Sequence, residues 1–199
     1  MKKTALIFAA ILALSVNAKA EKIKLIVDAA HGGKDAGARA ATGEKESDLC
    51  LQYALAIQEE AAKKNIEVVL VRTTDEYQSL EQRNNFKPET GVKTYYIAFH
   101  MNAENSKTTR GAVIQYNAKT KDAASAKTFA EKLQNGFNLI NDIGTQINSD
   151  CKAQVVKTSE VPAVIIEPGY ISNEQDLRKL KDKGIQQEVA MLVVKAASE

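Results

Sequence analysis

Apolar and polar positions alternate along the chain in blocks that predict strands and helices in turn. Short apolar or β-prone runs predict six strands, at 23–28, 67–71, 95–99, 112–116, 153–157 and 163–167. Apolar residues at helical spacing predict longer helices at about 46–64, 126–137 and 185–196, and Ser172-Asn173 predicts the cap of a short one. This order predicts a three-layer α/β/α domain with a twisted, mostly parallel sheet of about six strands flanked by helices.

The first twenty residues have the pattern of a secretory signal peptide. Lys2 and Lys3 precede a short apolar stretch at 5–16, and Ala18-Lys19-Ala20 is a small-x-small cleavage site. An uncleaved membrane anchor is the alternative, but the apolar stretch is too short to span a bilayer comfortably. We therefore expect cleavage near Ala20, an exported periplasmic or secreted protein, no membrane span in the mature chain, and a single domain at 21–199.

Removing this segment changes the charge balance. The full chain has 27 Lys and Arg against 25 Asp and Glu, and loss of Lys2, Lys3 and Lys19 leaves 24 against 25, a net charge of −1. This balance gives no indication of a nucleic-acid partner. An exported chain can pair its two cysteines, Cys50 and Cys151. Because Cys50 lies within a predicted helix, a buried free thiol is at least as well supported.

Both histidines of the chain lie just beyond predicted strands. His31 follows the first strand, His100 directly follows the third, and the last strand ends on Glu167. Taken singly, each histidine is more simply a loop or core residue. If the strands are parallel neighbours, however, all three side chains meet at the carboxyl edge of the sheet, where open α/β sheets bind ligands. Two histidines and a carboxylate are also a common zinc-binding set.

Other acidic residues lie close to this edge. Glu46, in the first turn of a predicted helix, could reach back to the histidines, although acidic residues also favour helix N termini because of the macrodipole. Glu44 is a competing candidate. Asp28 and Asp35 flank His31. Asp28 could orient an imidazole, as carboxylates near metal-bound histidines do, or simply cap the glycine turn.

Glu167 is the most informative of the carboxylates. It closes an apolar run and is followed by Pro168-Gly169, so we expect it to be partly buried. Isolated buried carboxylates are costly and are usually paired or functional. The alternative to a functional role is an ion pair with Arg72 or Arg83.

Several blocks of sequence match one known pattern, in order, over nearly the whole mature chain. They are 25–38 around His31, 46–51 around Glu46, 72–75 with Leu80 and Arg83, 100–103 beginning at His100, 111–112, and 161–173 around Glu167. Together they resemble the zinc-dependent N-acetylmuramoyl-L-alanine amidases of the third amidase class, which are exported enzymes that trim peptidoglycan. The chain departs from the family pattern at Ala29-Ala30, Ser47, Cys50 and Ala98, and none of these removes a candidate ligand.

The resemblance implies a role for each candidate residue. It favours Glu46 over Glu44 as a ligand, so that His31, Glu46 and His100 bind one Zn²⁺ and leave a position open for water. It makes Glu167 the catalytic carboxylate, which takes a proton from that water. The remaining candidates, which would orient ligands or substrate, are Asp28, Asp35, Arg83 and Asn102.

The implied reaction is hydrolysis of the amide between N-acetylmuramic acid and L-alanine in peptidoglycan or muropeptides. We expect the protein to be a monomer. The alternatives are another cell-wall zinc peptidase, or a non-catalytic peptidoglycan-binding module on the same fold. Some periplasmic members of this family carry an inhibitory helix before the second histidine. Residues 75–95 leave little room for one, so we expect a site that is not occluded by its own chain.

Overall fold

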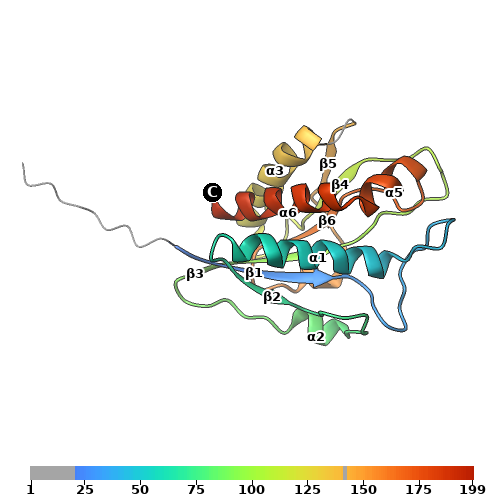
Figure 1. The fold of residues 1–199 in the computed structure, drawn as a ribbon. Helices are drawn as coiled ribbons and strands as arrows, with labels where there is room; N and C mark the ends of the chain where they lie inside the picture. Colours follow the sequence, from blue (N-terminus) through green and yellow to red (C-terminus); the bar gives the residue numbers. More distant parts are fainter. Residues whose placement is uncertain (1–20, 141–142) are drawn as a thin grey trace, which may run out of the picture.

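A six-stranded sheet organises the computed structural model, which describes residues 21–140 and 143–199. The predicted signal peptide lies outside the described residues. The strands are β1 (Lys22–Ala29), β2 (Glu67–Leu70), β3 (Val92–Phe99), β4 (Ala112–Gln115), β5 (Thr145–Asn148) and β6 (Ala163–Glu167). Their order across the sheet is β2-β1-β3-β6-β4-β5 (Figure 1). Strands β2, β1, β3 and β6 are parallel to one another. Strand β4 is antiparallel to β6, and β5 is parallel to β4. The predicted mostly parallel sheet is confirmed.

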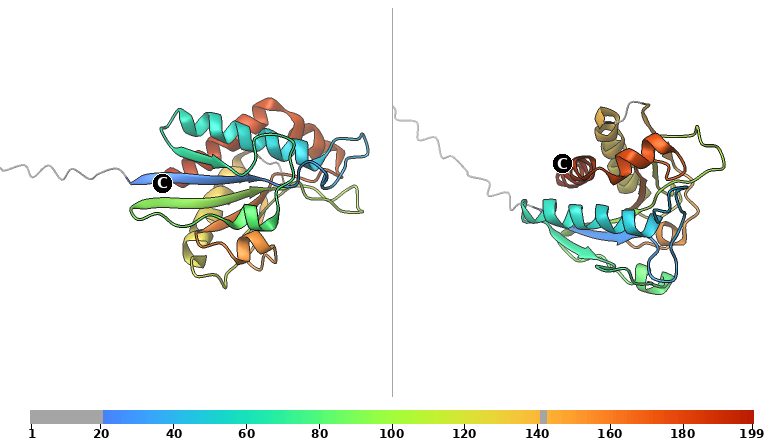
Figure 2. Two further views of the ribbon diagram at one scale, coloured as in Figure 1. Left: turned by 90° about the horizontal axis from the view of Figure 1, so that it is seen from below. Right: turned by 45° about the vertical axis from the view of Figure 1, so that its right-hand side comes forward.

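Four helices cover one face of the sheet (Figures 1 and 2). They are α1 (Glu46–Ala62), α3 (Ala123–Ile140), α5 (Glu174–Lys181) and α6 (Lys183–Ser198). Alternate strand residues such as Val27 and Phe99 pack here against helix residues such as Tyr53 and Leu133. The Tyr53 ring stacks on Phe99 at 5.4 Å between centroids. This face therefore holds the larger of the two apolar clusters.

The opposite face has a thinner cover of loops and two short helices, α2 (Leu80–Asn84) and α4 (Gln154–Lys157). A smaller cluster, which includes Tyr96 and Ile165 from the sheet, packs under α4. Both cysteines are free and buried, Cys50 in the larger cluster and Cys151 in the smaller one. The sheet separates them, so the disulfide alternative is wrong.

One predicted strand is wrong. Residues 153–157 form the helical turn α4, closed by a hydrogen bond from Lys157 N to the Ala153 carbonyl. Val155 and Val156 are both buried in the same cluster. A strand would point these adjacent side chains to opposite faces, whereas a helical turn lets both pack on one side. The strand that completes the six-stranded sheet is instead β5, at 145–148.

The helix ends agree with the sequence to within a few residues. The side chain of Asn173 caps α5 by accepting hydrogen bonds from the backbone N–H groups of Gln175 and Asp176, as the Ser172-Asn173 pair predicted. Helix α1 begins at Glu46, as expected, and ends two residues earlier than predicted. Among the described residues, every helix is too short or too polar to cross a bilayer.

Candidate active site

The strands that lead to the candidate residues end in register. Phe99 at the end of β3 pairs with Ala29 of β1 on one side and with Ile166 of β6 on the other. The backbone N–H of His100 continues this pairing by donating to the Ile166 carbonyl at 3.1 Å. His100 and Glu167 come directly after Phe99 and Ile166, and His31 comes two residues after Ala29, so the predicted meeting of three strand ends at one edge is confirmed.

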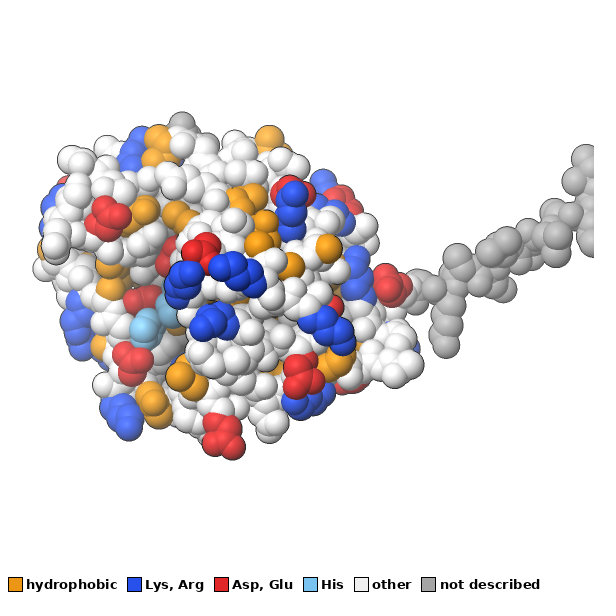
Figure 3. Space-filling model, turned by 180° about the vertical axis from the view of Figure 1, so that it is seen from behind, with side chains coloured by type: hydrophobic (Ala, Val, Ile, Leu, Met, Phe, Trp, Pro, Cys, Tyr) orange, Lys and Arg blue, Asp and Glu red, His pale blue; other side chains and the backbone are white. Residues whose placement is uncertain are grey.

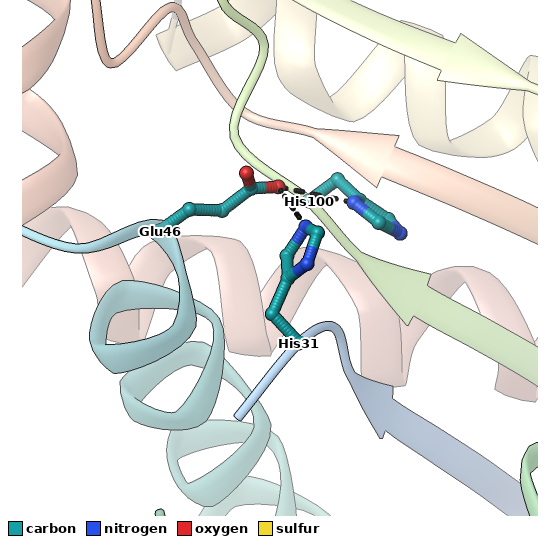
Figure 4. Close-up of side chains that lie close together, drawn as sticks. All are labelled: His31, Glu46 and His100. Atoms are coloured by element: carbon teal, nitrogen blue, oxygen red, sulfur yellow. Dashed lines mark hydrogen bonds and ion pairs between the residues drawn. The ribbon is translucent and has the colours of Figure 1, made fainter. Parts of the chain in front are cut away.

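His31, Glu46 and His100 form a close cluster at this edge (Figure 4). Glu46 Oε1 lies 3.2 Å from His31 Nε2 and 3.0 Å from His100 Nδ1. One potential ligand atom from each side chain lies within 4.8 Å of the other two. The two imidazole rings are nearly perpendicular, at 85°, with centroids 5.1 Å apart. The structure thus brings together the three side chains that the sequence named as candidate ligands.

Glu46 is held as a buried acceptor of hydrogen bonds. Its Oε2 accepts from the Ala38 backbone N–H at 2.8 Å, and its Oε1 accepts from that of Met101 at 3.0 Å. Burial opposes ionisation of the carboxyl, but the bonds from His100 and His31 outweigh it and hold the pKa of Glu46 well below its usual range. The competing candidate, Glu44, points instead to Lys181.

A strained loop presents His31 to this carboxylate. His31 itself has a left-handed backbone, with φ of 61°. Its Nδ1 lies 2.8 Å from Asp35 Oδ2, which leaves Nε2 facing Glu46. The bond to Glu46, helped by Asp35 and opposed by burial, raises the pKa of His31. Asp35, one of the residues named from the sequence, is therefore the carboxylate that orients an imidazole.

The same loop requires a glycine at position 37. Gly37 has φ of +63°, and a Cβ there would lie 2.6 Å from Glu46 Oε2 and 2.6 Å from Cδ2 of His31. Ala30, one of the departures from the family pattern, is not left-handed: the only described non-glycine residues with positive φ are His31 and Asn65. Ala30 therefore fits this loop without backbone strain of that kind.

The sequence suggested that Asp28 could orient an imidazole. In the structure Asp28 contacts neither imidazole directly. One of its oxygens accepts from Arg83 Nη1 and the other from the Tyr96 hydroxyl at 2.6 Å. Arg83 in turn donates to the His31 carbonyl at 2.8 Å. This buried pair supports the backbone of the loop rather than either ring, because Asp28 reaches His31 only through Arg83.

Glu167 lies at the same edge, partly buried, with its Oε2 directed at two amides. Asn102 Nδ2 lies 3.2 Å from this oxygen and Gln115 Nε2 lies 2.9 Å from it. Burial raises the pKa of Glu167, against the opposing influence of the His100 charge and of the Gln115 bond. The alternative of an ion pair is wrong: the guanidinium of Arg72 binds backbone carbonyls, and that of Arg83 binds Asp28 and carbonyls.

Gln115 is the contact that sequence reasoning missed. The signal was a single amide in the apolar strand 112–116, on the same strand face as Val113. Register pairs Val113 with Glu167 and Gln115 with Ile165, so Gln115 lies diagonally across from the carboxylate. Only the antiparallel pairing of β4 with β6 reveals this neighbour.

A groove of about 270 Å³ runs beside the histidines on the thinly covered face. Its lining combines residues of 77–83, including Tyr77 and Leu80, with residues 153–155. A larger hollow, of about 920 Å³, lies at the amino ends of β1 and β3, away from the cluster. The imidazoles reach the surface (Figure 3), with 22% of the His31 and 30% of the His100 side chain exposed. Within the described residues the cluster is therefore open to solvent.

Comparison with known proteins agrees with this geometry. The chain is 29% identical over 170 residues to N-acetylmuramoyl-L-alanine amidase CwlM of Bacillus licheniformis, covering 84% of this chain and 64% of that protein. It is 34% identical over 161 residues to probable cell wall amidase LytH of Staphylococcus aureus, covering 80% of this chain and 52% of that protein. The chain thus spans between about half and two thirds of these curated relatives.

Solved structures extend the likeness to the fold. The structure of N-acetylmuramoyl-L-alanine amidase from Clostridium difficile 630 superposes with a TM-score of 0.76 at 28% identity, covering 88% of this chain and 95% of that one. The family model described as N-acetylmuramoyl-L-alanine amidase matches residues 25–199. This match includes both histidines, Glu46 and Glu167. The chain therefore belongs to the N-acetylmuramoyl-L-alanine amidase family, Amidase_3.

Proposed function

We propose that this chain is a zinc-dependent N-acetylmuramoyl-L-alanine amidase. Its substrate would be peptidoglycan or muropeptides, in which it cuts the amide between the lactyl group of N-acetylmuramic acid and L-alanine. The observation that carries the proposal is the cluster of His31, Glu46 and His100 beside Glu167, at one edge of the sheet, in a member of this family. Peptidoglycan cleavage needs a hydrolytic centre that a large substrate can reach, and this cluster is open to solvent.

The donor set fits a zinc ion. Two imidazole nitrogens and one carboxylate oxygen are ligands of the kind that catalytic zinc uses, and their atoms lie within 4.8 Å of one another. His31 would offer Nε2, because Asp35 occupies its Nδ1, and His100 would offer Nδ1. When bound, one Zn²⁺ would supply Lewis acidity at the scissile carbonyl and lower the pKa of a water molecule.

The protein itself supplies the proton transfer. Glu167 takes a proton from the attacking water and delivers it to the departing L-alanine nitrogen, so that the amide becomes a free amine and a carboxylic acid, which then ionises to solvent. Burial favours this role, because a raised pKa brings the carboxyl closer to the pH at which it must both accept and release a proton. Glu167 has no cationic partner within hydrogen-bond distance among the described residues.

We further propose that residues 21–199 are a single catalytic domain, exported as a monomer to the periplasm or outside the cell. The signal-peptide pattern at 1–20 supports export. The exposed imidazoles support a site that the chain does not occlude: within the described stretch 75–95 the only helix is the five-residue α2, and β3 begins at Val92.

Digestion of purified peptidoglycan tests the proposal. The chain would be incubated with added zinc or with a chelator, and the soluble products analysed by mass spectrometry. We expect peptides that begin with a free L-alanine amine and glycans with an intact lactyl group, and we expect the chelator to abolish both. Cleavage between stem residues would instead indicate a zinc peptidase, and binding to the sacculus without any products would indicate a non-catalytic module.

A further inference from the structure

A chain of side-chain amides joins Glu167 to the far edge of the sheet. Gln115 Nε2 donates to Glu167 Oε2 at 2.9 Å, and Asn148 Nδ2 donates to Gln115 Oε1 at 3.0 Å. The register explains the contact, because Gln115 on β4 and Asn148 on β5 are directly paired neighbours. Three adjacent strands, β6, β4 and β5, therefore each contribute one residue to this hydrogen-bonded row: the Glu167 carboxylate and the Gln115 and Asn148 amides, which we call the amide chain.

The direction of every bond in the amide chain is fixed from one end. The backbone N–H of Asp150, which can only donate, bonds to Asn148 Oδ1 at 3.0 Å. Asn148 must then present its NH₂ group to Gln115, which accepts with its own oxygen. Gln115 is left with its NH₂ group facing Glu167, where it can only donate.

Asn102 is oriented in the same way. Its Oδ1 accepts from the Ala103 backbone N–H at 2.9 Å, so its NH₂ group faces Glu167 Oε2. Its own backbone is tied to the loop after β6 by bonds to Gly169 and Ile171. Both donors therefore meet the same carboxylate oxygen, and Glu167 Oε1 has no hydrogen-bond partner among the described residues.

We propose that Gln115, oriented by Asn148, is a positioning residue that holds Glu167 by Oε2 and reserves Oε1 for the proton of the attacking water. The inference rests on the proposed amidase function. An oxygen that accepts two N–H donors has little room for a proton, whereas its partner oxygen is free to bind one and give it back. Gln115 would act through Glu167 and touch neither substrate nor metal.

Substitutions at position 115 test the proposal in the zinc-loaded chain. Gln115→Met keeps the length of the side chain and removes the donor. We expect kcat to fall about 10- to 100-fold, by analogy with the loss of partners that orient metal ligands. KM and zinc content should stay within about twofold of the wild type, since substrate binding and the ligands are untouched.

Two further variants separate donation from packing. Gln115→Glu preserves the shape and the bond from Asn148 but turns a second carboxylate toward Glu167, so it should lower kcat more than Gln115→Met does. Asn148→Ala leaves the Gln115 amide in place but free to turn, so its loss should be the smallest of the three.

The matched control is Gln134→Met. Gln134 on α3 donates from Nε2 to the Thr145 carbonyl at 2.8 Å, so the same substitution also removes one bond to the β5 edge, but away from Glu167. We expect a similar loss of thermal stability in Gln134→Met and Gln115→Met, with kcat unchanged only in Gln134→Met. Equal kcat in Gln115→Met and Gln134→Met would overturn the inference while leaving the amidase function intact.

An independent readout does not depend on activity. In a ¹⁵N-labelled sample, the side-chain NH₂ resonances of Gln115 should move on Glu167→Gln, whereas those of Gln134 should not. If the wild type releases no amidase products, the proposed function fails, and this measurement still decides whether Gln115 bonds to Glu167. Unmoved Gln115 resonances would contradict the contact itself.

Discussion

Two glutamates at the same sheet edge have opposite environments. Glu46 accepts hydrogen bonds from two imidazoles and two backbone N–H groups, and its pKa is lowered. Glu167 accepts from two neutral amides, and burial raises its pKa. A carboxylate that stays ionised suits the binding of a cation, while one with a raised pKa suits proton transfer. The two proposed roles are therefore distinguished by the hydrogen bonds that each carboxylate accepts, since both are glutamates shielded from solvent.

The largest expected effect comes from removing the ionised carboxylate. Glu46→Ala should abolish stoichiometric zinc binding and activity together, because it deletes one of the three proposed ligands and leaves the Met101 and Ala38 N–H groups without their acceptor. Unsatisfied buried donors of this kind cost on the order of 1–3 kcal/mol each. Metal analysis and thermal denaturation check the result.

Glu44→Ala is the control for this variant. Glu44 bonds to Thr42 and Lys181 on the surface and faces neither histidine. We expect normal zinc content and normal turnover. Loss of zinc in Glu44→Ala, with retention in Glu46→Ala, would reverse the assignment of the ligand.

The next effect is steric. Gly37→Ala would place a methyl group against both Glu46 and His31, and we expect zinc affinity to fall about 10- to 100-fold. Gly43 also has a positive φ, of +102°, but a Cβ there has nothing within 4 Å. Gly43→Ala therefore carries the backbone strain alone, and competition with a chromophoric chelator should show wild-type affinity. Equal affinities in the two variants would mean that crowding at Gly37 does not matter.

A smaller effect is expected on the far side of His31. Asp35→Asn keeps a hydrogen-bonding oxygen but removes the charge that faces Nδ1. We expect zinc affinity to fall by about 10-fold, as for other groups that orient metal-bound histidines, with Glu167 and its bonds untouched. Titration calorimetry with zinc measures this loss. An unchanged affinity would show that the Asp35 charge is dispensable.

The smallest effect is on stability and follows from the sign of each pKa difference. In metal-free protein Glu167 has a raised pKa, so the folded state holds its proton more tightly and stability falls as pH rises through the interval between the unfolded and folded values. Glu167→Gln should therefore raise the Tm at neutral pH by a few degrees or less, and the gain should vanish below the ordinary carboxyl pKa.

Glu46 should behave in the opposite way. Its folded pKa is depressed, so its charge stabilises the fold above the unfolded pKa, and this contribution is lost as pH falls toward the folded value. Glu46→Gln should accordingly lower the Tm at neutral pH. Thermal scans of both variants from acid to neutral pH, with chelator present, make the test. The same sign for both variants would contradict the comparison.

Much of this edge could be predicted from the sequence, because strand ends are local signals. Apolar runs that stop just before His31 and His100, and on Glu167, placed these residues on one edge as soon as the strands were taken as parallel neighbours. Strand β5 was missed because Thr145–Asn148 contains a single apolar residue and lies at the sheet's outer edge. Helix α4 was mistaken for a strand because adjacent valines are β-prone in any short window.

The electrostatic difference between the glutamates could not be predicted in this way. The bonds that Glu46 accepts from Ala38 and Met101 are made by backbone N–H groups. Every non-proline residue has such a group, so the residue types at these positions do not predict the bonds. The amides around Glu167 reach it through the antiparallel register of β4, a pairing between segments 52 residues apart. Both features depend on tertiary structure.

Glu167→Gln is the most direct test of the division of roles. Zinc stoichiometry and product release from purified peptidoglycan should be measured on the same preparation of this variant and of the wild type. The account predicts wild-type zinc content and a turnover reduced about 10²- to 10⁴-fold, the usual contribution of a general base. Wild-type turnover, or loss of zinc together with activity, would contradict the assignment of Glu167 as a base that does not hold the metal.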